Sequence, residues 1–175
     1  SDSVGGINNI PEYGVTSDGD VFVKVVDGMY NGYVIKDPED ILFDADGNFK
    51  KNINVDVTAK APIKSIVVKV SSDNAEFTAA YDDVMPLECN ICDGTVSNTF
   101  LKLMGYPTDA KGALATRLKF GAQADMLRTY EGTHSYEITV VDANGGKTTA
   151  TLMVKYGQNV APSIVWVGYD IDKRQ

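Results

Sequence analysis

The chain is poor in the residues that reactive sites, membrane spans and nucleic-acid binding require. Its 175 residues include two cysteines, one histidine and one tryptophan, and 16 basic residues stand against 24 acidic ones. The net charge of −8 disfavours nucleic acid and anionic membrane surfaces as partners, since the basic residues are scattered. A membrane-spanning helix needs a run of about 18 apolar residues, and no run in the chain is close to that length. We expect membrane contact only through a lipid anchor outside residues 1–175.

The single histidine also argues against catalysis. A nucleophilic hydrolase needs a base beside its nucleophile and a carboxylate that orients the base, and no G-x-S-x-G or comparable element occurs in the chain. Carboxylates are plentiful, but they cluster in predicted turns instead of in a cleft. We therefore predict a protein that is not an enzyme, has no catalytic residues and no cofactors, and uses His134 near the start of a strand.

What the chain does contain is alternation of apolar and polar residues with a period of two, the pattern of half-buried strands. It occurs at residues 21–26, 33–36, 53–58, 66–70 and 114–120. The first two of these segments flank Asn31-Gly32, which suits a tight hairpin turn. The clearest unit is a hairpin over residues 134–156, in which Asn144-Gly145 supplies the turn and the apolar positions of both strands face one core.

Residues 74–110 interrupt the alternation and predict a long crossover with one or two helical turns. The pattern "AEFTAAY" is helical, and so is "SNTFLKLMGYP", with Ser97 or Asn98 as its N-terminal cap and a stop at Gly105. A further short helix is predicted in "AQADMLRTY". It places Ala122, Met126 and Tyr130 on one side of the helix.

Short strands joined by tight turns and by one long crossover predict an all-β fold. We expect an Ig-like antiparallel β-sandwich with Greek-key links and short helical excursions. Residues 1–16 are predicted to form an N-terminal tail, residues 17–157 the sandwich, and residues 158–175 a linker and the first strand of a following module. Pro162 discourages continuation of the preceding strand. The alternative is that the segment around Trp166 docks on the sandwich as a final edge strand.

The order of four segments carries a resemblance to a known family. These are "VDVTAKAPIKSIVVKVSSD", "LKLMGYPTDAKG", "FGAQADMLRTYEGTHSYEITVVDANGGKTTATLMVKY" and "PSIVWVGYDIDKR". Over about residues 50–172 the chain resembles the Ig-like modules of Bacteroidetes surface lipoproteins, which occur in tandem or ahead of a carbohydrate-related domain. The resemblance implies an exported outer-membrane lipoprotein at the cell surface. It brings no catalytic residues with it.

Cys89 and Cys92 form a C-x-x-C pair inside the predicted crossover. A redox motif of this kind usually follows a strand of a βαβ unit, and that context is missing here. A structural zinc site needs four ligands, and the only histidine lies about 40 residues away. A disulfide across a short loop, two free thiols, and a metal or redox role stay open as three alternatives, the first two favoured in an exported protein.

Asp44, Asp46 and Asn48 have the one-three-five spacing of a calcium-binding loop. The match ends there, because Phe49 stands where the loop needs glycine and Val55 where it needs a bidentate glutamate. A β-turn explains the same residues through their backbone preferences. We predict no metal site and keep these three residues as weak calcium candidates.

Four aromatic residues are the candidates for ligand binding: Tyr30, Tyr33, Trp166 and Tyr169. Exposed aromatic faces can stack on sugar rings, whereas strand tyrosines often pack at the edge of a core with the hydroxyl in water. Two functions follow. The first is a non-catalytic spacer or adhesion module that contacts other surface proteins. The second is a carbohydrate-binding module with an extracellular glycan as its partner, in a polysaccharide-degrading or glycan-uptake system.

Overall fold

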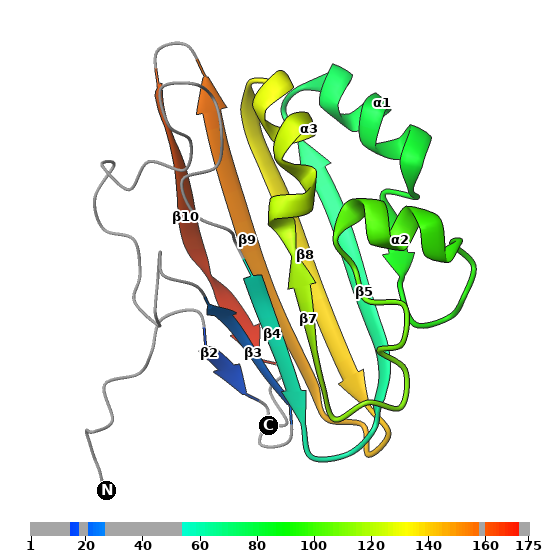
Figure 1. Cartoon of the computed structure of the whole chain (residues 1–175). Helices are drawn as coiled ribbons and strands as arrows, with labels where there is room; N and C mark the ends of the chain where they lie inside the picture. Colours follow the sequence, from blue (N-terminus) through cyan, green and yellow to red (C-terminus); the bar gives the residue numbers. More distant parts are fainter. Residues whose placement is uncertain (1–14, 18–20, 27–53, 158–159, 172–175) are drawn as a thin grey trace, which may run out of the picture.

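The computed structural model describes residues 15–17, 21–26, 54–157 and 160–171, and this part of the chain is mostly β (Figure 1). It forms a five-stranded sheet of order β10-β9-β8-β5-β6 and a four-stranded sheet of order β2-β3-β4-β7. All pairings are antiparallel. The strands are β2 (Val15–Ser17), β3 (Val21–Val26), β4 (Asn54–Ala59), β5 (Ile63–Ser72), β6 (Glu88–Asn90), β7 (Ala115–Lys119), β8 (Gly132–Asp142), β9 (Lys147–Gly157) and β10 (Val160–Ile171).

The two sheets share one buried core, and Figure 1 shows β4 and β7 lying in front of β8 and β9. Alternation in the sequence supplies that core, because every second side chain of a strand faces the same side. The buried positions include Val55 and Val57 in β4, Ile66, Val68 and Val70 in β5, Tyr136, Ile138 and Val140 in β8, and Ala150, Leu152 and Val154 in β9. The prediction of an all-β chain with a common apolar interior is confirmed at this level.

Within the described residues the chain changes sheet three times, and two of these changes match. It passes from β4 in the smaller sheet to β5 in the larger one, and later from β7 in the smaller sheet to β8 in the larger one. β4 pairs with β7, and β5 pairs with β8. The predicted hairpin of β8 and β9 is confirmed, with Gly145 in its turn at a φ of 84°.

The predicted crossover contains both expected helices and one strand that we did not predict. Helix α1 (Ala75–Val84) begins after Asn74, whose side chain accepts hydrogen bonds from two backbone N–H groups. Helix α2 (Asn98–Met104) is capped by Ser97 and ends at Gly105, as predicted. Between them, β6 pairs with β5. Three residues are too few to show a period of two, so nothing local in the sequence indicates this strand.

Gly105 is a position where only glycine suits the backbone. Its φ is 82°, and a Cβ there would overlap the carbonyl oxygen of Lys119. The Lys119 N–H donates to the Gly105 carbonyl over 2.8 Å. The end of α2 therefore lies directly against the end of β7.

The third helical segment is present as predicted, and two of the three residues that we placed on one side of it pack against the core. It starts as a 3₁₀ turn, η1 (Phe120–Gln123), and continues as α3 (Ala124–Thr129). Met126 and Tyr130 pack against the core, but Ala122 is exposed and Leu127 is buried instead. The 3₁₀ turn has three residues per turn, which rotates the following helix away from the register that a uniform α-helix would have.

The last described segment pairs with the sheet. β10 runs antiparallel to β9 from Val160, opposite Gly157, to Ile171, opposite Thr148. This is the edge-strand alternative that the sequence left open. Pro162 lies at one of two shifts in the register, where a residue without an N–H is tolerated. The expected hairpin partner at 33–36 and the Asn31-Gly32 turn lie outside the described residues.

No helix within the described ranges has the length and apolar character needed to cross a lipid bilayer.

Candidate functional site

The structure describes only two of the four aromatic candidates. Tyr30 and Tyr33 lie outside the described residues, as do the calcium candidates Asp44, Asp46 and Asn48. Trp166 and Tyr169 lie on β10, where they are paired in register with Leu152 and Ala150 of β9. An aromatic platform that joins all four residues stays a prediction.

Cys89 and Cys92 are both free thiols, which is one of the alternatives that the sequence left open. Cys89 is buried on β6 and Cys92 is half-buried in the turn after it. The Asn90 side chain organises this turn, because its Oδ1 accepts from the N–H groups of Ile66 and Cys92. Burial raises the pKa of both thiols. A reactive cysteine needs the opposite shift, so this environment suits packing and not nucleophilic chemistry.

His134 is fully buried on β8 and has partners on every side. Its ring stacks on Phe77 of α1, with centroids 3.8 Å apart. Nε2 lies 2.8 Å from the carbonyl oxygen of Tyr130, and Nδ1 lies 2.7 Å from the Ser72 hydroxyl. A carbonyl only accepts, so we assign the proton to Nε2 and the donor role on the other side to Ser72. Burial lowers the pKa of His134, which keeps the ring neutral. The prediction that it lies near the start of a strand is confirmed.

The structure contains a buried network of tyrosines around Gln123 that the sequence did not predict. The hydroxyls of Tyr81 and Tyr106 lie 3.0 Å apart, and Gln123 Nε2 donates to the Tyr106 hydroxyl and to the Met104 carbonyl. The Tyr136 hydroxyl donates to Gln123 Oε1 over 2.9 Å. The network joins α1, the end of α2, η1 and β8. The only signal in the sequence was that Tyr81 and Tyr136 occupy apolar positions of their periods.

These tyrosines stay protonated at neutral pH. Burial raises the pKa of Tyr106 to about 12. The pKa values of Tyr81 and Tyr136 are also raised, first of all by burial and then by the neighbouring tyrosines. Neutral hydroxyls with fixed partners hold elements together, and none of the three is prepared to act as a base at pH 7.

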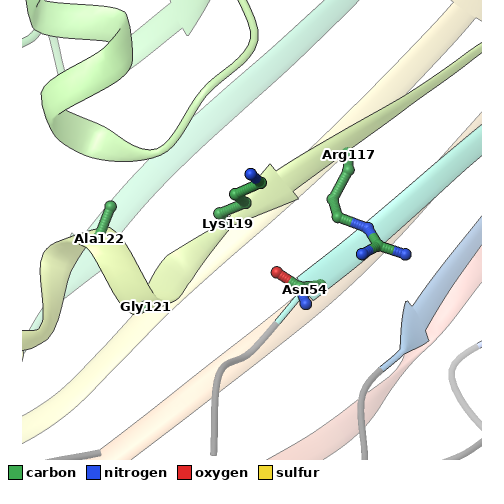
Figure 2. Close-up of a pocket in the computed structure, with 5 residues that line it drawn as sticks. All are labelled: Asn54, Arg117, Lys119, Gly121 and Ala122. Carbon is green, nitrogen blue, oxygen red and sulfur yellow. The ribbon is translucent and has the colours of Figure 1, made fainter.

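The described surface has two adjoining hollows over the end of β7. One has a volume of about 340 Å³ and is lined by Asn54, Arg117, Lys119, Gly121 and Ala122 (Figure 2). The other, of about 290 Å³, shares Arg117 and Lys119 and adds Lys102, Gly105, Tyr106 and Pro107. We call the two together the β7 groove. Its lining contains three cations, in a chain whose net charge is −8.

The register of β4 and β7 builds the groove. Asn54 pairs with Lys119, and Asp56 pairs with Arg117. The Arg117 guanidinium donates to both carboxylate oxygens of Asp56, through Nε to Oδ1 and through Nη2 to Oδ2 at 3.0 Å. Figure 2 shows Arg117 reaching from β7 over β4, close to Asn54. A bidentate contact of this kind fixes the plane of the guanidinium.

The sequence predicted the strands that form this groove but not their pairing. The polar positions of β4 and β7 were visible as the alternate residues of two strands, but their pairing was not.

Within the part of the chain that the structure describes, no group of three or more His, Cys, Asp or Glu residues is placed to hold a metal ion.

Comparison of the chain with family models, curated proteins and solved structures gave no match.

Proposed function

We propose that the chain is a non-catalytic Ig-like module of an exported, outer-membrane cell-surface lipoprotein, where it acts as a spacer or adhesion module. The observation that carries the proposal is the matched change of sheet. In Ig-like sandwiches, strands B and E pair in one sheet while their successors C and F pair in the other. β4 and β7, followed by β5 and β8, fit that scheme, with β9 in the position of strand G.

The dimensions and interior suit a spacer. β8 and β9 have 11 residues each, so at about 3.3 Å per residue the hairpin is about 35 Å long. Its interior is held by a shared apolar core and by hydrogen bonds between fixed partners, such as Tyr136 with Gln123. A rigid element of this length can hold a neighbouring domain away from a membrane. The cell-surface location rests on the family resemblance of residues 50–172.

The test uses the full-length protein in intact cells, with an epitope tag placed beyond the module. One variant lacks the module, and a second carries an unrelated Ig-like domain of similar length in its place. For a spacer, antibody access to the tag decreases in the deletion and is restored by the replacement. An adhesion role predicts that the replacement restores access but not attachment to the partner surface. Unchanged access and attachment in both variants contradict the proposal.

A carbohydrate-binding module is the second candidate. The observation that favours it is the placement of Trp166 and Tyr169 on one edge strand, β10, three positions apart. A glycan array compares the chain with Trp166→Ala and Tyr30→Ala variants. Saturable glycan binding that either substitution abolishes supports this function, and the absence of binding in the unaltered chain excludes it for the glycans on the array.

A further inference from the structure

We propose that the β7 groove binds an acidic polysaccharide, whose carboxylates contact Lys102, Lys119 and Arg117 and whose hydroxyls contact Asn54. This goes beyond a spacer role. It is also independent of the aromatic residues on β10.

The charge of the groove is opposite to that of the chain. Lys102 comes from the last turn of α2, while Arg117 and Lys119 come from β7, and all three line hollows that adjoin. The backbone contact between Gly105 and Lys119 is what brings α2 to β7. A cationic depression within a surface of the opposite sign concentrates anions at that one place.

The guanidinium of Arg117 is preorganised. Asp56 accepts two of its hydrogen bonds from the neighbouring strand and so holds the group over β4 before any ligand arrives. A side chain that is already ordered loses little entropy when it binds. Lys102 and Lys119 are exposed and can adjust to the spacing of charges along a ligand.

The lining favours a sugar over a polypeptide. Tight protein contacts depend on aromatic or aliphatic anchors that enter pockets. In the groove, Tyr106 is only 3% exposed, and the other side chains without charge or amide are those of Ala122 and Pro107. Cations, an amide and glycine backbone suit a chain rich in carboxylates and hydroxyls. The volumes of the two hollows fit small rings and not the face of a protein.

Nucleic acid fits the groove less well. Single-stranded nucleic acid is bound along an extended basic track with exposed aromatic residues between the cations. The lining of the groove has three cations, and its one aromatic side chain, Tyr106, is buried and offers no face for a base to stack on.

The experiment measures binding of the 175-residue chain to polygalacturonate by calorimetry, with dextran as the neutral polymer. We expect saturable binding to polygalacturonate that weakens as salt is added, and none to dextran. Lys119→Glu should weaken the affinity about tenfold, since it removes one attraction and adds one repulsion. The matched control is Lys64→Glu, which makes the same charge change at an exposed position of β5 in the other sheet. It should stay within about twofold of the unaltered chain.

Several outcomes overturn the proposal. One is that the unaltered chain fails to bind polygalacturonate, and another is that Lys119→Glu and Lys64→Glu weaken binding equally while both melt like the unaltered chain. If poly-L-glutamate or single-stranded DNA binds as tightly as polygalacturonate, the groove is not specific for a polysaccharide and the proposed ligand is wrong. Loss of binding in Trp166→Ala but not in Lys119→Glu moves the site to β10. That last result supports the carbohydrate-binding function while excluding the groove.

Discussion

The imidazole of His134 lies flat against the ring of Phe77, with an angle of 20° between the two planes. This contact joins β8 of the larger sheet to α1 in the crossover. Both residues are completely buried. The ring of His134 is therefore a structural part of the core whose charge state is coupled to folding.

We predict that the chain loses stability as the pH falls below about 6.5, the ordinary pKa of histidine in an unfolded chain. Burial lowers the pKa of His134 in the folded state, so the unfolded state binds the proton first. The stability that the neutral His134 ring contributes is present in full above the pKa of histidine in the unfolded chain. It is lost as the pH falls from that value towards the lower pKa of His134 in the folded chain. Urea unfolding at closely spaced pH values between 7.5 and the onset of carboxylate titration measures the slope.

The control is His134→Phe, which keeps an aromatic ring against Phe77 but does not titrate. It should be less stable at pH 7, because the Ser72 hydroxyl and the Tyr130 carbonyl lose their partner. Its stability should change less steeply over the same pH window. Equal slopes in the two proteins would show that His134 is not the titrating group.

The hydrogen bonds of Gln123 predict that substitutions of Gln123 and Tyr136 lower the unfolding free energy by amounts that do not add. Gln123→Leu leaves the Tyr136 hydroxyl and the Met104 carbonyl without their partner in the core, at a cost of about 2–4 kcal/mol of unfolding free energy. Tyr136→Phe should cost about 1–2 kcal/mol, because it removes the donor and leaves one amide oxygen unsatisfied. The double variant should be more stable than the sum of the two losses predicts. Additive losses in urea unfolding would mean that the two side chains are not coupled.

Two glycines with nearly the same φ make a matched pair. Gly105→Ala combines a left-handed backbone with overlap between the new methyl group and Lys119, and should cost about 3 kcal/mol or more. Gly145→Ala has a φ of 84° with open space around the added carbon, and should cost about 1 kcal/mol. Thermal melting of the two variants measures the difference. Equal melting temperatures would argue against close contact between α2 and β7.

The raised pKa values of Cys89 and Cys92 predict slow alkylation of the folded chain at neutral pH. The thiolate is the reactive form, and burial reduces its share at pH 7. Cys92 should react with iodoacetamide before Cys89, because Cys89 is buried and Cys92 only half-buried. In urea both should react rapidly, and mass spectrometry counts the added groups. If neither cysteine is alkylated in urea until a reductant is added, they form a disulfide.

The local patterns of the sequence predicted the local elements well. α2 was recognisable because Ser97 and Gly105 mark its two ends, and caps of this kind depend on neighbours within four residues. The hairpin of β8 and β9 was recognisable because alternation on both strands surrounds the Asn144-Gly145 turn. The candidate site was different. Arg117 and Asp56 are 61 positions apart in the chain, and neither residue's neighbours indicate the other.

By itself, therefore, the sequence determined most of the longer strands, which of their faces enters the core, and where α2 begins and ends. Those properties follow from periods and caps that neighbouring residues create. The tertiary structure alone decided that β10 continues the sheet beside β9, that Gln123 joins Tyr106 to Tyr136, and that three cations gather over β7. The physical reason is that pairing between distant strands depends on the competition among all the apolar faces for one shared core.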